Sequence, residues 1–72
     1  MKKRSVSIRG HRTSYSIEDA FQEELNAIAL REAKPVARMI ARIDAARQQD
    51  QNLSSAIRLF VLDDLRKRAR EI

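Results

Sequence analysis

The amino-acid sequence predicts a small, mainly α-helical domain with one short strand, and three observations support this prediction. The 72 residues include one glycine, one proline and only 4% aromatic residues, a composition typical of helices. Apolar residues recur every three or four positions in three segments, and residues 12–17 alternate between apolar and polar in the way of a strand. Because the chain is short and lacks cysteine, we expect a second copy of the chain to stabilise it, rather than disulfides or thiolate-bound metals.

Positive charge is concentrated at the two ends of the chain, which has a formal net charge of +5. The first twelve residues contain no acid and carry the cations Lys2, Lys3, Arg4, Arg9 and Arg12. We interpret residues 1–11 as a basic N-terminal arm that favours a polyanionic partner, the alternative being a terminus that only aids solubility. Two large apolar residues between residues 5 and 13 are too few for a signal peptide, so we expect a cytoplasmic protein without a membrane span.

The segment 12–17, RTSYSI, predicts the strand. Its apolar face consists of Thr13, Tyr15 and Ile17, and its polar face consists of Arg12, Ser14 and Ser16. Residues 5–9 also alternate, but out of phase with residues 12–17, so the register must break near Gly10. Two arrangements remain open, a hairpin that turns at Gly10 and His11 or a flexible basic arm followed by one strand. We favour the flexible arm.

Two amphipathic helices follow the strand. The first is expected to begin at Glu18 or Asp19, with Ser16 and Asp19 forming a capping box, and to end before Pro35. Its apolar stripe consists of Phe21, Leu25, Ile28 and Ala29, and Gln22 and Asn26 are expected to face away from the core. The second helix opens at Pro35, and its stripe consists of Val36, Met39, Ile40 and Ile43.

A third helix is predicted after a polar linker at residues 48–52, with Asn52 or Ser54 as its cap. This C-terminal helix, residues 53–72, carries apolar residues almost all round, including Leu59 and Leu62. A monomer of this size cannot cover such a helix on every side, so the sequence predicts a homodimer. No internal repeat is visible.

Catalytic groups are nearly absent from the sequence. His11 is the only histidine and has no carboxylate close to it in sequence, so we expect it at the surface or near a phosphate rather than on a metal. Adjacent acids on a helix diverge by about 100°, which excludes a carboxylate dyad at residues 23–24 or 63–64. We therefore predict a protein that is not an enzyme and that has no cofactor and no metal site.

A single strand leaves its backbone donors and acceptors unpaired, so we expect two copies of residues 12–17 to pair across a dimer as an antiparallel ribbon. A two-stranded ribbon fits the major groove of B-DNA. Its outward face would then present Arg12, Ser14 and Ser16, whose side chains suit base reading. The alternative is that these three residues only form the solvated face of a strand, which shows the same alternation.

Residues 13–43, TSYSIEDAFQEELNAIALREAKPVARMIARI, resemble the ribbon-helix-helix DNA-binding family, to which the Arc and MetJ repressors belong. Residues 3–21 and 52–65 are similar to a bacterial subfamily with an additional C-terminal helix. The resemblance implies a ribbon-helix-helix core at residues 12–47 in a homodimer with an intermolecular antiparallel β-ribbon. The sequence departs from the family at two points. Ala33 replaces the glycine that is usual in the turn between the helices, and Lys34-Pro35 replaces the serine or threonine that usually caps the second helix.

The same resemblance implies which residues contact DNA. Base contacts would come from Arg12, Ser14 and Ser16, and phosphate contacts from Lys34 and from the amides near Val36 that open the second helix. Apart from the resemblance, the charge of the arm predicts further phosphate contacts from Lys2, Lys3, Arg4 and Arg9. The expected function is that of a bacterial transcriptional regulator that binds duplex DNA. The alternatives are an antitoxin that grips its toxin with the C-terminal helix, and a protein-interaction module that does not bind DNA.

Overall fold

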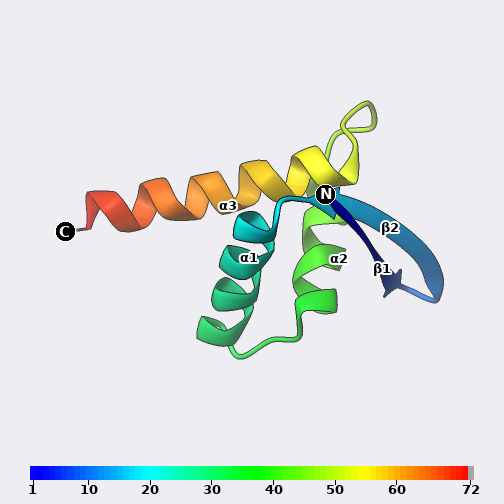
Figure 1. The fold of residues 1–72 in the computed structure, drawn as a ribbon, viewed down its shortest axis with the longest axis horizontal. Coiled ribbons are helices and arrows are strands. Elements are labelled where there is room, and N and C mark those ends of the chain that lie inside the picture. Colours follow the sequence, from blue (N-terminus) through cyan, green and yellow to red (C-terminus); the bar gives the residue numbers. More distant parts are fainter. Residues whose placement is uncertain (72) are drawn as a thin grey trace.

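The computed structural model describes residues 1–71 and contains a β-hairpin and three helices (Figure 1). The elements in chain order are β1 (Lys2–Ile8), β2 (His11–Ile17), α1 (Asp19–Arg31), α2 (Val36–Ala46) and α3 (Leu53–Arg70). In Figure 1, α1 and α2 lie side by side, and α3 crosses the end of this pair next to the hairpin. The last residue of the predicted C-terminal helix, residue 72, lies outside the described residues.

The flexible arm favoured from the sequence is wrong, because residues 2–8 form β1 and pair with β2. The strands are antiparallel, in a register that runs from Lys2 opposite Ile17 to Ile8 opposite His11. The turn residues Arg9 and Gly10 both have positive φ, 52° and 82°. Two consecutive positive φ values are typical of a type I′ turn, whose twist matches that of paired strands. The expected single strand is thus one half of an intrachain hairpin.

The core lies between the hairpin and the three helices. The hairpin contributes Ile8, Tyr15 and Ile17, and the helices contribute Leu25, Ile28, Ala29, Met39, Ile40, Ile43, Leu53, Ala56, Ile57 and Val61. Most of the stripe residues expected on the first two helices are buried, while Phe21 and Val36 are partly buried against the core. The helical spacing of apolar residues therefore predicted the inward faces of α1 and α2.

The polar side of α1 differs from its prediction. Gln22 is buried, and its Oε1 accepts a hydrogen bond of 2.8 Å from the Tyr15 hydroxyl. Gln22 Nε2 in turn donates to Asn26 Oδ1 at 2.8 Å. The predicted capping box is also wrong, since Glu18 is the N-cap of α1 and no side chain caps this helix. The Tyr15 hydroxyl needs a partner when it is buried, and Gln22 provides it.

The connection between α1 and α2 is a tight turn without glycine. Ala33 adopts a left-handed conformation with φ of 55°, and the Lys34 N–H donates to the Ala29 carbonyl at 2.9 Å. This six-to-one bond is typical of a Schellman motif, in which glycine usually occupies the left-handed position. Pro35 is the N-cap of α2, one position before the helix rather than its first residue.

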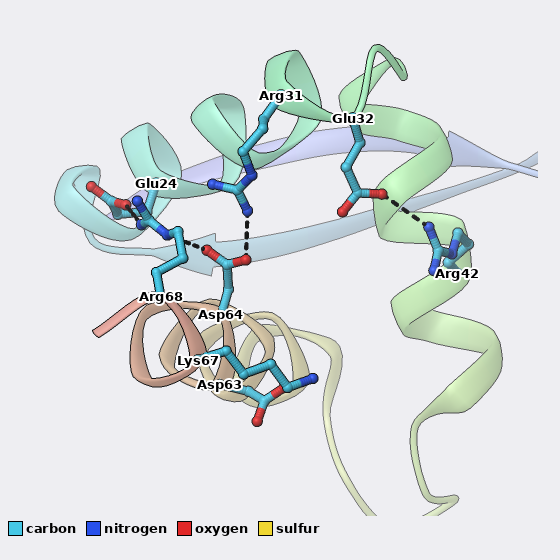
Figure 2. A network of polar contacts seen from close by, with 8 residues as sticks. All are labelled: Glu24, Arg31, Glu32, Arg42, Asp63, Asp64, Lys67 and Arg68. Carbon is cyan, nitrogen blue, oxygen red and sulfur yellow. Dashed lines mark hydrogen bonds and ion pairs between the residues drawn. The ribbon is translucent and has the colours of Figure 1, made fainter. Parts of the chain in front are cut away.

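Helix α3 is held by a cap at its start and by ion pairs along its length. Asn52 Oδ1 accepts from the Ser55 N–H at 2.8 Å, so Asn52 is the cap. Figure 2 shows Asp64 between Arg31 of α1 and Arg68, whose Nη2 also lies 3.2 Å from Glu24 Oε1. Single exposed ion pairs add little stability, and this connected set joins the C-terminal half of α3 to α1.

Apolar side chains remain exposed on the helices. The exposed fraction is 83% for Leu30, 55% for Leu59, 38% for Leu62 and 39% for Leu65. Three of these leucines belong to α3, whose buried residues all lie between Leu53 and Val61. Among residues 1–71, no helix is long and apolar enough to cross a membrane.

Candidate nucleic-acid interface

One face of the hairpin points away from the helices, and we call it the outer face. It consists of three cross-strand pairs, Lys3 with Ser16, Ser5 with Ser14 and Ser7 with Arg12. Five of these side chains are exposed, and Ser16 is half-buried. A shallow depression of about 400 Å³ lies on this face, lined by Lys3, Ser5, Arg12, Thr13 and Ser14. The outer face is therefore an open, polar and positively charged surface.

The structure brings Arg12, Ser14 and Ser16 together on this face, as the alternation in β2 predicted. It adds Ser5 and Ser7, which the sequence reasoning missed, and it places Lys3 beside them instead of on an arm. The signal that could have found them was the alternation of residues 5–9 followed by Gly10. A two-residue turn reverses the chain, so the phase difference between the two segments puts their apolar residues on one face.

The serine and arginine side chains of the outer face have free hydrogen-bonding capacity. Within residues 1–71, no protein group bonds to the side chains of Lys3, Ser5, Ser7, Arg12, Ser14 or Ser16. Arg12 has five N–H donors in a planar fork, and serine hydroxyls both donate and accept. The face therefore offers donors at two cationic positions and adaptable hydroxyls between them.

Helix α3 contacts the backbone edge of β2 that faces away from β1, near the end of this strand. The Ser16 N–H points away from β1 and donates to Ser54 Oγ at 2.9 Å, while Arg58 Nη2 lies 3.5 Å from the Ser16 carbonyl oxygen. Arg58 Nε also donates to Glu18 Oε1 at 2.9 Å. This hydrogen bond from Arg58 is the main cause that lowers the pKa of the Glu18 carboxyl below its ordinary value. The Ser16 hydroxyl therefore does not cap α1, although the sequence predicted that it would.

The remaining cations of β1 do not share the outer face. Lys2 is exposed but lies in the row of side chains on the helix side of the hairpin, opposite Ile17. Arg4 lies in the same row, and its Nη2 is 3.3 Å from Asp19 Oδ1. The Arg4 Nε is buried and has no partner among the described residues. Lys2, Lys3 and Arg4 therefore do not form one cationic surface, because only Lys3 lies on the outer face.

Arg9 lies at the tip of the hairpin, beside a groove along α2. The groove has a volume of about 400 Å³ and is lined by Arg9, Arg38, Ala41, Arg42, Ala45 and Ala46. Arg42 is paired with Glu32 at 3.4 Å, whereas Arg9 and Arg38 form no ion pair within residues 1–71. The groove is therefore lined by the guanidinium groups of Arg9 and Arg38, which form no ion pair within residues 1–71, and by the small side chains of three alanines.

The predicted phosphate contacts at the second helix lie at the opposite end of α1 from the hairpin junction (Figure 1). Lys34 and Val36 are both half-buried there, and no side chain caps α2. The Pro35 carbonyl accepts hydrogen bonds from the backbone N–H groups of Arg38 and Met39. The Val36 N–H lies before these donors, in the first turn, where backbone N–H groups have no acceptor within the helix. Their contact with phosphate stays a prediction.

The only histidine is exposed and lies next to the turn. His11 is the first residue of β2 and faces Ile8 across the hairpin. In the part of the chain that the structure describes, no three histidine or acidic side chains cluster as a metal ion requires.

Comparison with protein families matches residues 1–65 to the ribbon-helix-helix domain. The chain belongs to the ribbon-helix-helix family. The matched residues include β1 and extend into α3, so the hairpin lies inside the family domain. Ribbon-helix-helix domains are DNA-binding regulatory modules rather than enzymes. The curated proteins and the solved structures yield no match to this chain.

Proposed function

We propose that this protein is a bacterial transcriptional regulator that acts in the cytoplasm and recognises specific duplex sequences by placing the outer face of its hairpin in the major groove. The observation that carries this proposal is the composition of that face, two cations and four serines without protein partners. A two-stranded ribbon has the width of the major groove, where each base pair shows its own pattern of donors and acceptors.

Arg12 is the strongest candidate for base reading. Its exposed guanidinium can donate two parallel hydrogen bonds to O6 and N7 of guanine, the commonest specific contact in such complexes. Ser14 and Ser16 follow along the same strand and can bond to any base edge. Behind them, the buried Tyr15 and Ile17 anchor β2 to the core, so this face is held in place before DNA binds.

Non-specific attraction to the DNA backbone would come from the other cations. The net charge of +5, Lys2 and the unpaired Arg9 and Arg38 all favour contact with phosphates. Lys34 and the Val36 amide are proposed to contact phosphates farther along the duplex. Arg4 is not included, because it is paired with Asp19.

The protein is proposed to act as a homodimer. The ribbon-helix-helix family implies a dimer, and the exposed Leu59, Leu62 and Leu65 of α3 give this chain an apolar surface that a second chain would cover. Burying such side chains favours association. Sedimentation is expected to give a dimer at tens of micromolar, and a folded monomer there would contradict this part of the proposal.

The function is tested by titrating the protein with its preferred duplex, selected from a random pool, and with a scrambled duplex of equal length. Arg12→Ala should lower affinity for the preferred duplex by roughly 1 to 3 kcal/mol and affect the scrambled duplex less. Arg66→Ala is the matched control, because Arg66 is exposed on α3, away from the hairpin. Equal affinity of the wild type for both duplexes would contradict sequence-specific binding.

An antitoxin is the second candidate, favoured by the same exposed leucines of α3 and by its basic end. In that case α3 would bind a toxin while the hairpin binds the operator. A protein-interaction module without a role on DNA is the remaining alternative. Affinity for DNA that ignores sequence and disappears at modest salt would favour it.

A further inference from the structure

Arginine side chains from two distant parts of the chain meet at the groove along α2. Arg9 comes from the tip of the hairpin, and Arg38 and Arg42 lie one turn apart on the exposed face of α2. The rest of the lining consists of small side chains that are too short to fill the groove, those of Ala41, Ala45 and Ala46. The potentials of neighbouring cations add, so the groove attracts an anion more strongly than one of these arginines would alone.

The three arginines differ in what they already bind. Arg9 and Arg38 have no acidic partner within residues 1–71. Arg42 Nη1 donates to Glu32 Oε1 at 3.4 Å, and Figure 2 shows Glu32 at the end of α1 facing Arg42 on α2. The exposed fractions of the Arg42 and Glu32 side chains are 57% and 38%. Such an exposed pair contributes little free energy, so a more highly charged anion can displace the Glu32 carboxylate.

We propose that this groove is a binding site for ligands with two or more neighbouring phosphate groups, and that Glu32 competes for it in the free protein. The inference goes beyond the proposed function, which uses Arg9 and Arg38 only as charges near DNA. A planar guanidinium group donates two parallel hydrogen bonds that match the oxygen atoms of a phosphate. Two phosphates can bridge Arg9 and Arg38 and draw Arg42 away from Glu32.

Two sources can supply this chemistry. Successive phosphates of a DNA strand have it, and so do free nucleoside diphosphates and triphosphates. A DNA backbone in the groove would be held beside the tip of the hairpin, whereas a free nucleotide would compete with DNA for the same arginines. Binding measured without DNA tests the site itself, and binding of a duplex identifies the source.

Inorganic pyrophosphate is the probe for the site, titrated into the full chain without DNA in a calorimeter. Wild type should bind pyrophosphate more tightly than acetate at equal ionic strength, because one carboxylate cannot bridge two guanidinium groups. Arg9→Gln and Arg38→Gln should each weaken pyrophosphate binding by roughly 3- to 10-fold, since each removes one charged donor at an exposed position. Arg66→Gln is the matched control, because Arg66 is equally exposed but lies on α3, outside the groove. This control should bind pyrophosphate as wild type does.

Glu32→Gln tests the competition by Glu32. Removing the carboxylate frees Arg42, so this variant should bind pyrophosphate roughly 2- to 5-fold more tightly than wild type. Glu23→Gln is the control, because Glu23 is an exposed acid of α1 outside the groove and its loss changes the net charge equally. An equal gain in both variants would assign the effect to net charge and overturn the role of Glu32.

Titrations with the scrambled duplex identify the source of the phosphates. If the DNA backbone occupies the groove, Arg9→Gln and Arg38→Gln should each weaken duplex binding and flatten the dependence of log affinity on log salt by about one unit per chain. Pyrophosphate should then displace the duplex from wild type. If ATP and pyrophosphate bind while both variants keep the affinity and salt dependence of wild type for the duplex, the occupant is a free nucleotide. Either result supports the phosphate site.

Two outcomes would overturn the inference while the proposed function stands. One is a wild type that binds pyrophosphate no better than acetate. The other is a pair of variants, Arg9→Gln and Arg38→Gln, that bind pyrophosphate as tightly as wild type, which would place the anion elsewhere. Neither outcome changes the preference of Arg12 for the selected duplex. Conversely, a wild type that binds pyrophosphate but shows no sequence preference on DNA would contradict the proposed function and leave the phosphate site in place.

Discussion

Strands β1 and β2 carry the same outward pattern but differ in what holds them. In β2, Tyr15 and Ile17 are 5% and 0% exposed, and Ser54 and Arg58 of α3 bond to the backbone at Ser16. In β1, Val6 is only partly buried and Ile8 is 8% exposed, and no helix bonds to its outer backbone edge within residues 1–71. The same pattern of side chains therefore does not bury two strands equally, because burial depends on the packing behind each strand.

Because of this difference, we expect the residues of β1 and β2 on the outer face to contribute unequally to DNA recognition. Arg12 and Ser14 lie on a strand whose other face is buried at Tyr15 and Ile17 and whose end is bonded to α3 at Ser16. Lys3 and Ser5 lie on a strand that pairs with β2 and contributes Ile8 and the partly buried Val6 to the core. Preorganised groups bind with a smaller loss of conformational entropy, so β2 is expected to contribute more to specificity per contact.

The largest expected effect comes from the buried end of β2. Ile17→Ala should lower the free energy of unfolding by about 2 to 5 kcal/mol, because it removes a fully buried side chain from the core. Val6→Ala in β1 should cost about 1 kcal/mol, because Val6 is only partly buried. Chemical denaturation of both variants measures the difference, and equal losses would contradict the unequal support of the strands.

The next effect concerns the buried hydrogen bond behind β2. Tyr15→Phe removes the donor to Gln22 Oε1 and leaves that buried oxygen without its partner. The free energy of unfolding should fall by about 1 to 3 kcal/mol. Thermal melts of Tyr15→Phe and of Tyr15→Phe/Gln22→Leu check this cause, since the double variant removes the unpaired oxygen and should recover part of the loss.

A smaller effect is expected where α3 holds the edge of β2. Ser54→Ala removes the acceptor for the Ser16 N–H and should cost about 0.5 to 1.5 kcal/mol. Ser55→Ala is the control, because Ser55 is the next residue of α3 and uses only its backbone N–H, which bonds to Asn52. Denaturation curves in which both variants lose the same stability would argue against a specific role for the Ser54 hydroxyl.

Stabilisation is expected at the turn that joins the two strands. Arg9 has a φ of 52°, a conformation that asparagine adopts more readily than arginine. Arg9→Asn should raise the free energy of unfolding by up to about 1 kcal/mol, whereas Arg9→Ala, which removes the charge but keeps the backbone penalty, should not. A gain in stability for Arg9→Ala would assign the effect to charge instead of the turn.

The smallest effect is a pH dependence at the junction of β2 and α1. Arg58 lowers the pKa of Glu18 below its ordinary value of 4.5, so the ionised carboxylate stabilises the folded state. This contribution is complete above pH 4.5 and is lost as the pH falls through the lowered pKa. Unfolding measured between pH 6 and pH 3 should depend on pH less steeply in Glu18→Gln than in wild type, and identical slopes would exclude Glu18 as a contributor.

Local patterns in the sequence determined much of this protein. Helical spacing predicted the inward faces of α1 and α2, Asn52 was one of two predicted caps of α3, and alternation in residues 12–17 placed Arg12 and Ser14 outward. These features depend on interactions between residues only a few positions apart. Such interactions can be read from the order of the side chains alone.

The tertiary structure decided everything that depends on contacts between distant residues. Residues 2–8 form a strand because Ile8 and Val6 pack against the core once the type I′ turn has reversed the chain. Gln22 is buried because the Tyr15 hydroxyl needs a partner, and the edge of β2 is held by Ser54, 38 residues farther along. Whether residues 1–11 form an arm or a strand depends on burial against the three helices, a free energy that the local sequence does not contain.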